Sequence, residues 1–471
     1  MTRAQAQIQE TQHQLDEMRK ELGELQQQMN SSRTTASPVK AEQNSPSRSS
    51  PVATAPTVPD IQNIREQQEM QQSEIATQDQ IKVESESKYP VKLTGLLLLN
   101  GFINTSAVDT PSTPSLSVSG PGSTGATVRQ TIFGLDARGP HLFGAQSYAD
   151  LRVDFNSNQQ AGSPPYNGYY GGNSTLLRLR TAHAGLQWQH TRAYFSLDRP
   201  IFNPESPTSL AAVAVPALAW SGNLWTWNPQ LGITRDFALT NSQNLRLQAA
   251  LIDTGDPPLL PPVTSSTGVT APGTAEQSRW PGIEARLAFF RPKNHDSENH
   301  FGVGGYFAPH NDSLGKKYDA WAGTLDGRFQ LPAQFQLTAS FYRGLGLGGL
   351  GGGAYKDFVS SYDADTKGYY FRALDDVGGW LQLQEKFSER LQFNAAFGLD
   401  NVFARELRPY AVYGGSIYQN LARNRTYTGN VIYSPSAYLL FSLEYRHIES
   451  APVMGSTNGA NVIGIAAGYK F

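Results

Sequence analysis

The chain has 471 residues, no cysteine and a formal net charge of −2 at pH 7. The absence of cysteine excludes disulfides and thiolate metal ligands, and the near-neutral balance of scattered charges gives no basis for nucleic-acid binding. The longest apolar runs, such as Leu96–Leu99, are far shorter than the ~20 residues of a membrane-spanning helix, whereas 44 glycines, 21 tyrosines and 22 phenylalanines suit many strands joined by turns.

Residues 1–30 carry a heptad pattern. The apolar residues at its two core positions are Ile8, Leu15, Met18, Leu22, Leu25 and Met29. Because the apolar stripe is narrow, we expect a short coiled coil that associates with copies of itself; a single amphipathic helix lying on another surface is the alternative.

Residues 31–88 separate this helix from the rest of the chain. Residues 31–60 hold five prolines among Ser, Thr and Ala, which predicts a disordered linker. Residues 61–88 are rich in Gln and Glu with a weaker helical pattern and form a connector. The start lacks the apolar core of a signal peptide, so we expect an export signal to lie upstream of this start or to be missing from this numbering.

Residues 89–471 form the main domain, in which apolar and polar side chains alternate with the period of two that strands require. Sixteen such segments occur, at about 91–104, 127–138, 145–155, 174–187, 190–199, 228–238, 243–254, 280–291, 299–309, 316–330, 334–343, 375–388, 389–402, 424–434, 437–448 and 460–471. Ambiguous connections at 310–315 and 331–333 leave counts of 14 or 18 open.

The connections between these segments alternate between long and short. Long ones such as 105–126 and 200–227 are followed by short ones such as 139–144 and 239–242. Transmembrane barrels have short periplasmic turns, longer outer loops and an even number of strands. We therefore predict an all-β fold: a 16-stranded antiparallel transmembrane barrel, because soluble sandwiches do not explain the alternating loop lengths.

The last segment ends in an aromatic residue. Ile463, Ile465, Ala467, Tyr469 and Phe471 share one face. This pattern resembles the closing strand of bacterial outer-membrane barrels, in which a final Phe marks the chain for the barrel-assembly machinery. The resemblance implies that Tyr469 and Phe471 form this assembly signal.

Neither catalytic nor metal-binding motifs stand out, and we expect no enzyme activity, no metal and no cofactor. Gly344–Gly349 matches a dinucleotide fingerprint by letters, but no helix can follow it, so we interpret it as a flexible outer loop. The histidines, including His300 in a predicted turn, lack the spacing of zinc ligands. We interpret His183, on an inward face, as a wall or interface residue.

Charged residues gather on the polar faces of the second to fifth segments. The arginines are Arg138, Arg152, Arg178, Arg180 and Arg192, and the carboxylates are Asp136, Asp150, Asp154 and Asp198. A water-filled lumen tolerates such charges, whereas lipid penalises each Arg by roughly 2–4 kcal/mol at mid-depth. The arginines would form a positive wall that selects anions, since guanidinium suits carboxylate; ion pairs that only stiffen the wall are the alternative.

The segment 200–227 is too apolar for a loop in water, with an Ala/Val stretch and Trp220, Trp225 and Trp227. We expect it to fold inward and narrow the pore. This arrangement, with Thr131–Gly139 and Leu177–Gly185, resembles the trimeric general porins of outer membranes. The coiled coil narrows the resemblance to their DcaP-like branch, which favours dicarboxylate-type anions. Acidic residues in this loop are sparse, since Glu205 stands alone.

Together these features predict a passive diffusion channel of a Gram-negative outer membrane for small hydrophilic solutes, with a mild preference for small carboxylates. The resemblance implies a homotrimer in outer-membrane lipid, with the amino-terminal extension in the periplasm and in reach of peptidoglycan. A substrate-specific barrel, a structural barrel anchored to the cell wall and a trimeric adhesin are the alternatives.

Overall fold

The computed structural model describes residues 90–157, 176–240, 242–258, 272–294, 297–312, 315–413 and 417–471, together with Met70. Apart from Met70, the predicted coiled coil at 1–30, with its six core residues, the linker at 31–60 and the connector at 61–88 all lie outside the described residues. The predictions for these three segments therefore stay predictions.

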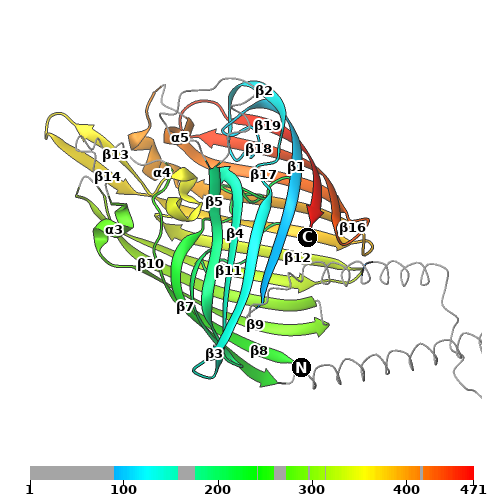
Figure 1. Ribbon diagram of the computed structural model, residues 1–471. Coiled ribbons are helices and arrows are strands. Elements are labelled where there is room, and N and C mark those ends of the chain that lie inside the picture. The colour runs from blue at the N-terminus through cyan, green and yellow to red at the C-terminus, as the bar shows by residue number, and fades with distance from the viewer. Residues whose placement is uncertain are drawn as a thin grey trace, which may run out of the picture. The chain divides into compact units, whose positions relative to one another are not determined.

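The described chain is built mainly of antiparallel strands (Figure 1). They are β1 Val91–Val108, β2 Ser117–Thr127, β3 Ile132–Leu142, β4 Ala145–Ser157, β5 Leu176–Gln187, β6 Thr191–Asp198, β7 Asn228–Thr240, β8 Gln243–Ile252, β9 Gly282–Asn294, β10 Ser297–Asn311, β11 Lys317–Gln330, β12 Phe335–Leu345, β13 Phe358–Asp363, β14 Gly368–Ala373, β15 Asp375–Lys386, β16 Leu391–Val402, β17 Leu421–Tyr433, β18 Leu439–Pro452 and β19 Asn458–Lys470.

Short helices lie in the connections: α3 Thr274–Ser278, η2 Gly348–Leu350, η3 Gly353–Tyr355, α4 Ala404–Leu407, η4 Arg408–Tyr410 and α5 Ile417–Asn420. The hairpin β13–β14 stands apart from the main sheet and gathers with α3, α4 and α5 at one end of the barrel (Figure 1). No helix in the described ranges is long and apolar enough to cross a membrane.

The main sheet closes on itself because β1 pairs with β19, with Leu97 opposite Tyr469. Strands β2 and β3 both pair with β1: β2 along its second half and β3 along Val91–Leu96. The two therefore occupy one strand position, interrupted at residues 128–131. Counted this way, the barrel has sixteen strand positions, which confirms the predicted 16-stranded antiparallel barrel.

The two faces of each strand lie in different environments, one outside the barrel and one inside it. On β18, Leu443 is 57% exposed on the outside, while its neighbour Glu444 is 2% exposed on the inside. Leu439, Phe441 and Tyr445 share the outward face. An apolar outer surface around a polar interior is the inverse of a water-soluble fold and suits a barrel in lipid.

The connections alternate between long and short through most of the barrel, but 312–316 and 453–457, on the long-loop side, are as short as the turn at 434–438. The ambiguous turn at 331–334 joins β11 to β12 on the short-turn side, and 312–316 joins β10 to β11 on the long-loop side. The first predicted long loop is wrong in extent. Most of 105–126 is strand, since β1 continues to Val108 and β2 begins at Ser117; its glycines and serines hid the alternation.

The final residue Phe471 joins the seam of the barrel. Its backbone exchanges hydrogen bonds with Gly95 at 2.8 and 3.1 Å, and its ring lies against Gly95, where a Cβ would clash with it. The ring also lies 6.0 Å from that of Phe133. The glycine therefore makes room for the terminal ring on the first strand.

Because the protein has no native cysteine, single-cysteine variants can test the two environments. Ile233 faces outward on β7, and its neighbour Thr234 lines an internal cavity. We expect a fluorophore on Ile233→Cys to be quenched by brominated lipid in liposomes, and one on Thr234→Cys by aqueous iodide. If both labels respond to the same quencher, the two-faced barrel is refuted.

Candidate pore constriction

The connection between β6 and β7, residues 199–227, runs inside the barrel; we call it the inner loop. Its apolar side chains are buried, with Phe202, Ala214 and Leu224 among the most enclosed. The Ala, Val and Trp residues that made this segment too apolar for water thus lie against the rest of the protein. Burial of an irregular loop requires partners for its backbone polar groups.

Side chains from the far wall hold the first part of the inner loop. The carbonyl of Phe202 accepts a hydrogen bond from Thr324 on β11, and Asn203 bonds to Ser340 on β12. Glu205 reaches Arg328 on β11 at 2.7 Å. This part of the loop is therefore fixed across the lumen from its own strand, β6.

The middle of the inner loop binds the strands near the seam. Gln382 on β15 accepts from the Thr208 amide at 2.7 Å, and Asn430 on β17 donates to the Thr208 carbonyl at 2.9 Å. Ser209 donates to Glu444 on β18, and Asn100 on β1 donates to Leu210.

The break between β2 and β3 supplies the next anchor. Gln130 lies in this break; its side-chain amide donates to the Ala211 carbonyl at 3.0 Å and accepts from the amides of Val213 and Ala214 at 2.7 and 3.0 Å. The interruption of the strand thus places a side chain that hydrogen-bonds three residues of the inner loop, Ala211, Val213 and Ala214.

A cluster of charged residues on β4 and β5 forms the last group of anchors for the inner loop. Asp154 binds Arg178 through both oxygens, at 3.0 and 2.6 Å, and Arg180 at 3.1 Å. These guanidinium groups also donate to the carbonyls of Ala214 and Val213 and lie 5.0 and 4.8 Å from the ring centre of Trp227. The cluster brings together three of the predicted pore residues, and they hold the loop.

The glycine-rich segment 344–357 packs against the returning arm of the inner loop. Tyr355 stacks on Trp220 with ring centres 4.2 Å apart, and the Leu350 carbonyl accepts from the Trp225 amide at 3.0 Å. The prediction of a flexible outer loop here is wrong, because residues 347–357 are buried. The glycines permit this close approach: a Cβ on Gly349 would meet the Gly255 carbonyl at 2.1 Å.

Two charged residues secure this segment. Asp357 accepts from the Gly348 amide and from the Tyr318 hydroxyl. The Lys356 ammonium donates to the carbonyls of Ala354, Tyr418 and Leu421, each at 2.9 Å. Burial lowers the pKa of Lys356 to about 7, against the opposing pull of nearby carboxylates.

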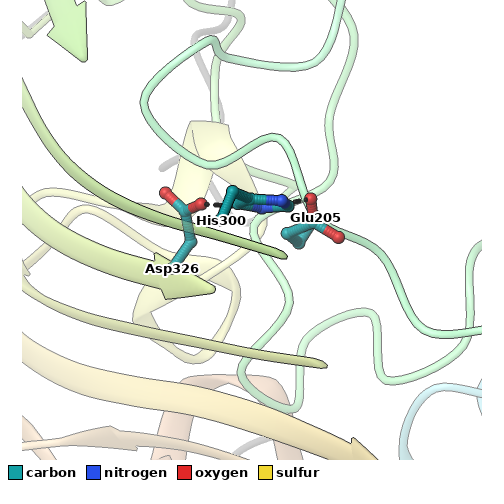
Figure 2. Close-up of side chains that lie close together, drawn as sticks. All are labelled: Glu205, His300 and Asp326. Atoms are coloured by element: carbon teal, nitrogen blue, oxygen red, sulfur yellow. Dashed lines mark ion pairs between the residues drawn. The ribbon is translucent and has the colours of Figure 1, made fainter. Parts of the chain in front are cut away.

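Glu205, His300 and Asp326 converge where the inner loop meets β10 and β11 (Figure 2). His300 Nε2 lies 3.0 Å from Glu205 and 3.6 Å from Asp326. Two carboxylates that are distant from His300 in the sequence therefore lie beside it in the fold. His300 belongs to β10 and not to a turn. Burial alone would raise the pKa of Glu205, but His300 and Arg328 outweigh it and lower that pKa.

The three side chains could in principle approach a cation. However, Arg286 already binds both oxygens of Asp326, and Arg328 binds Glu205. Two arginines thus balance the two carboxylates. The donor set is that of an ion-pair network between loop and wall.

The remaining predicted pore residues are spread along the wall. His183 lies between Asp150 and Asp198, at 2.8 and 2.9 Å. Arg152 pairs with Asp136 at 2.6 Å. Arg192 lies over the ring of Tyr148 at 5.9 Å, and Arg138 is exposed on β3 near the short turn.

The arginines therefore do not form an unbroken positive wall. Arg152, Arg178 and Arg180 are each paired with a carboxylate. This supports the stiffening interpretation for these three, while Arg138 and Arg192 make no ion pair with another described residue. Sequence reasoning missed the loop anchors Asn100, Gln130 and Glu444, because a polar residue at or beside an inward position was their only signal.

The chain matches no protein-family model, and no curated protein resembles it in sequence. Among solved structures, the outer membrane channel DcaP of Acinetobacter baumannii aligns with a TM-score of 0.58 at 18% identity, over 83% of this chain and 99% of that one. The chain has the porin fold.

Two further solved structures align less closely. The anion-selective porin from Comamonas acidovorans has a TM-score of 0.49 at 9% identity, over 82% of this chain and 100% of its own. Pseudomonas putida OprB has a TM-score of 0.48 at 12% identity, over 81% and 94%. The alignment with DcaP confirms the resemblance to DcaP-like porins as a likeness of fold.

Substitution of Asp154 by Asn should destabilise the barrel strongly. The Asp154 side chain has no exposed surface, and its loss leaves two arginines without a carboxylate, which costs ~3–5 kcal/mol. The matched control is Asp136→Asn, since that pair is about a third exposed and is worth under about 1 kcal/mol. Urea unfolding in detergent measures both, and equal losses would contradict the role of Asp154.

The lowered pKa of Lys356 makes stability depend on pH. The unfolded chain holds this proton up to its ordinary pKa of 10.5, whereas the folded chain releases it near pH 7. The unfolded state therefore binds more protons between these values, and stability should rise from pH 7 to pH 9. Lys356→Met should remove this part of the rise, and identical pH profiles for both proteins would count against it.

Proposed function

We propose that this protein is a passive diffusion channel of an outer membrane for small hydrophilic solutes. The observation that carries the proposal is a closed barrel with an apolar outside and a charged, polar inside. A charged, polar interior suits an aqueous path through the barrel. The fold shared with a protein described as an outer membrane channel supports the same proposal.

In this proposal the inner loop sets the width of the path. Its anchors on β11, β12, β15, β17, β18 and β1 support this role, because they carry the loop across the lumen. The packing of segment 344–357 against the loop adds a second wall on the same side. A solute would pass through the space that these two segments leave.

We further propose a mild preference for anions such as small carboxylates. Arginines on the inward faces of β3 to β6 support it, and the carboxylates paired with several of them explain why the preference would be mild. No covalent chemistry is needed for this function, and we propose no enzyme activity and no cofactor.

The proposed assembly is a homotrimer in outer-membrane lipid, inserted by the barrel-assembly machinery with Tyr469 and Phe471 as its signal. The heptads at 1–30 support self-association. The extension would lie in the periplasm, where it could brace the trimer or reach peptidoglycan.

A substrate-specific or structural barrel is the second candidate. The extensive burial of the inner loop favours it, since a loop that fills its barrel leaves little room for general diffusion. A trimeric adhesin has less support, because one chain supplies all sixteen strand positions.

Planar lipid bilayers separate these candidates. A porin should give steady ohmic steps that close in threes if it is a trimer, and replacing residues 206–217 by a short Gly-Ser linker should raise the unit conductance because the constriction is removed. As a control, the same linker in the short turn at 387–390 should leave the conductance unchanged. A correctly folded barrel that carries no current with or without the inner loop rejects the channel.

A further inference from the structure

A polar cavity of about 220 Å³ lies between the inner loop and the wall formed by β4 to β8. A second cavity of about 100 Å³ continues it toward the short turn at 188–190, and the two share Arg192, Thr234 and Gln248 as lining residues. The anchors of the inner loop lie mostly on other strands, from β10 round to β5. The open space thus lies beside β4 to β8, the part of the wall to which the loop is least anchored.

Two arginines line the first cavity without a carboxylate partner. Arg192 lies beside Tyr148 and makes no ion pair with any described residue. The guanidinium of Arg199 donates to the carbonyl of Glu205 at 3.1 Å and likewise makes no ion pair within the described ranges. Burial lowers the pKa of Arg199 to about 10, so it stays positively charged at neutral pH.

The carboxylates of this cavity are already engaged. Asp198 accepts from the Arg199 amide at 2.7 Å and faces His183, which bridges it to Asp150. Each imidazole nitrogen faces a carboxylate oxygen, and both can donate only when the ring carries two protons. The charges left free to meet a solute are therefore the two guanidinium groups.

We propose that Arg192 and Arg199 form the subsite that recognises the carboxylate group of a small organic acid, and that Arg178 and Arg180 serve only to hold the inner loop. This inference rests on the proposed channel function and names the residues that would set its preference. A guanidinium fork matches a carboxylate in shape and charge.

The other lining residues of the cavity indicate what kind of group the solute carries beside its carboxylate. Tyr148 and Tyr194 present aromatic rings with a hydroxyl each, and Ile201 and Pro204 of the inner loop add apolar surface. At ~30 Å³ for each water in the liquid, the space holds about seven waters. It therefore fits an organic acid with a short apolar or aromatic body.

Benzoate and its uncharged analogue benzamide can test the subsite on the full-length protein. In bilayers with a KCl gradient, benzoate should block the wild-type current more than benzamide does. R192Q/R199Q should lose this difference and shift the reversal potential toward cations. The matched control R235Q/R423Q removes two arginines exposed on the outer face and should leave both readouts unchanged.

The outcomes separate this inference from the proposed function. Wild-type current with an unchanged R192Q/R199Q variant overturns the subsite and leaves the channel intact. If no current flows, the channel is rejected, and calorimetric titration of benzoate onto the folded protein in detergent decides the subsite alone. Saturable heat that disappears in R192Q/R199Q supports it, and no heat overturns it. R192K/R199K, which keeps the charge, should retain the reversal potential and shows whether the glutamine variant merely misfolds.

Discussion

The need to pair every buried backbone group of the inner loop governs the interior of this protein. An irregular segment has no internal ladder of hydrogen bonds, so a loop inside a barrel depends on side chains of the wall. Asn100, Gln130, Gln382 and Asn430 meet this need by binding loop amides and carbonyls. The polar residues on the inward face thus bind the inner loop in one particular course, in addition to contacting water.

The same constraint separates the inward arginines into those that pair with a carboxylate and those that do not. Arg178 and Arg180 combine a carboxylate, loop carbonyls and the ring of Trp227 in one cluster. Arg192 and Arg199 lie on the sector where the loop has fewer anchors. Arg199 donates to the Glu205 carbonyl, and neither guanidinium group makes an ion pair with a described residue. In our proposal, the charges that hold the loop and the charges that select a solute lie on neighbouring sectors of one wall.

Much of the fold could be predicted from sequence because each strand alternates between two solvents, as Leu443 and Glu444 do. The partners of individual charges could not, since they depend on register and on loops. Glu205 and His300 are far apart in the chain and meet only because the inner loop crosses the lumen. The break that frees Gln130 has no local signal, and the glycines of 344–353 suggested mobility where the structure uses them for close packing.

The packing of the Phe471 ring on Gly95 has a consequence for how the barrel folds. The edge of the first strand stays unsatisfied until the last strand arrives, and an unpaired strand edge invites aggregation. Closure of the barrel thus joins Gly95 and Phe471, which are 376 positions apart, a non-local event of the kind that slows folding. A nascent chain must accordingly be shielded from its own copies until synthesis reaches the carboxyl terminus.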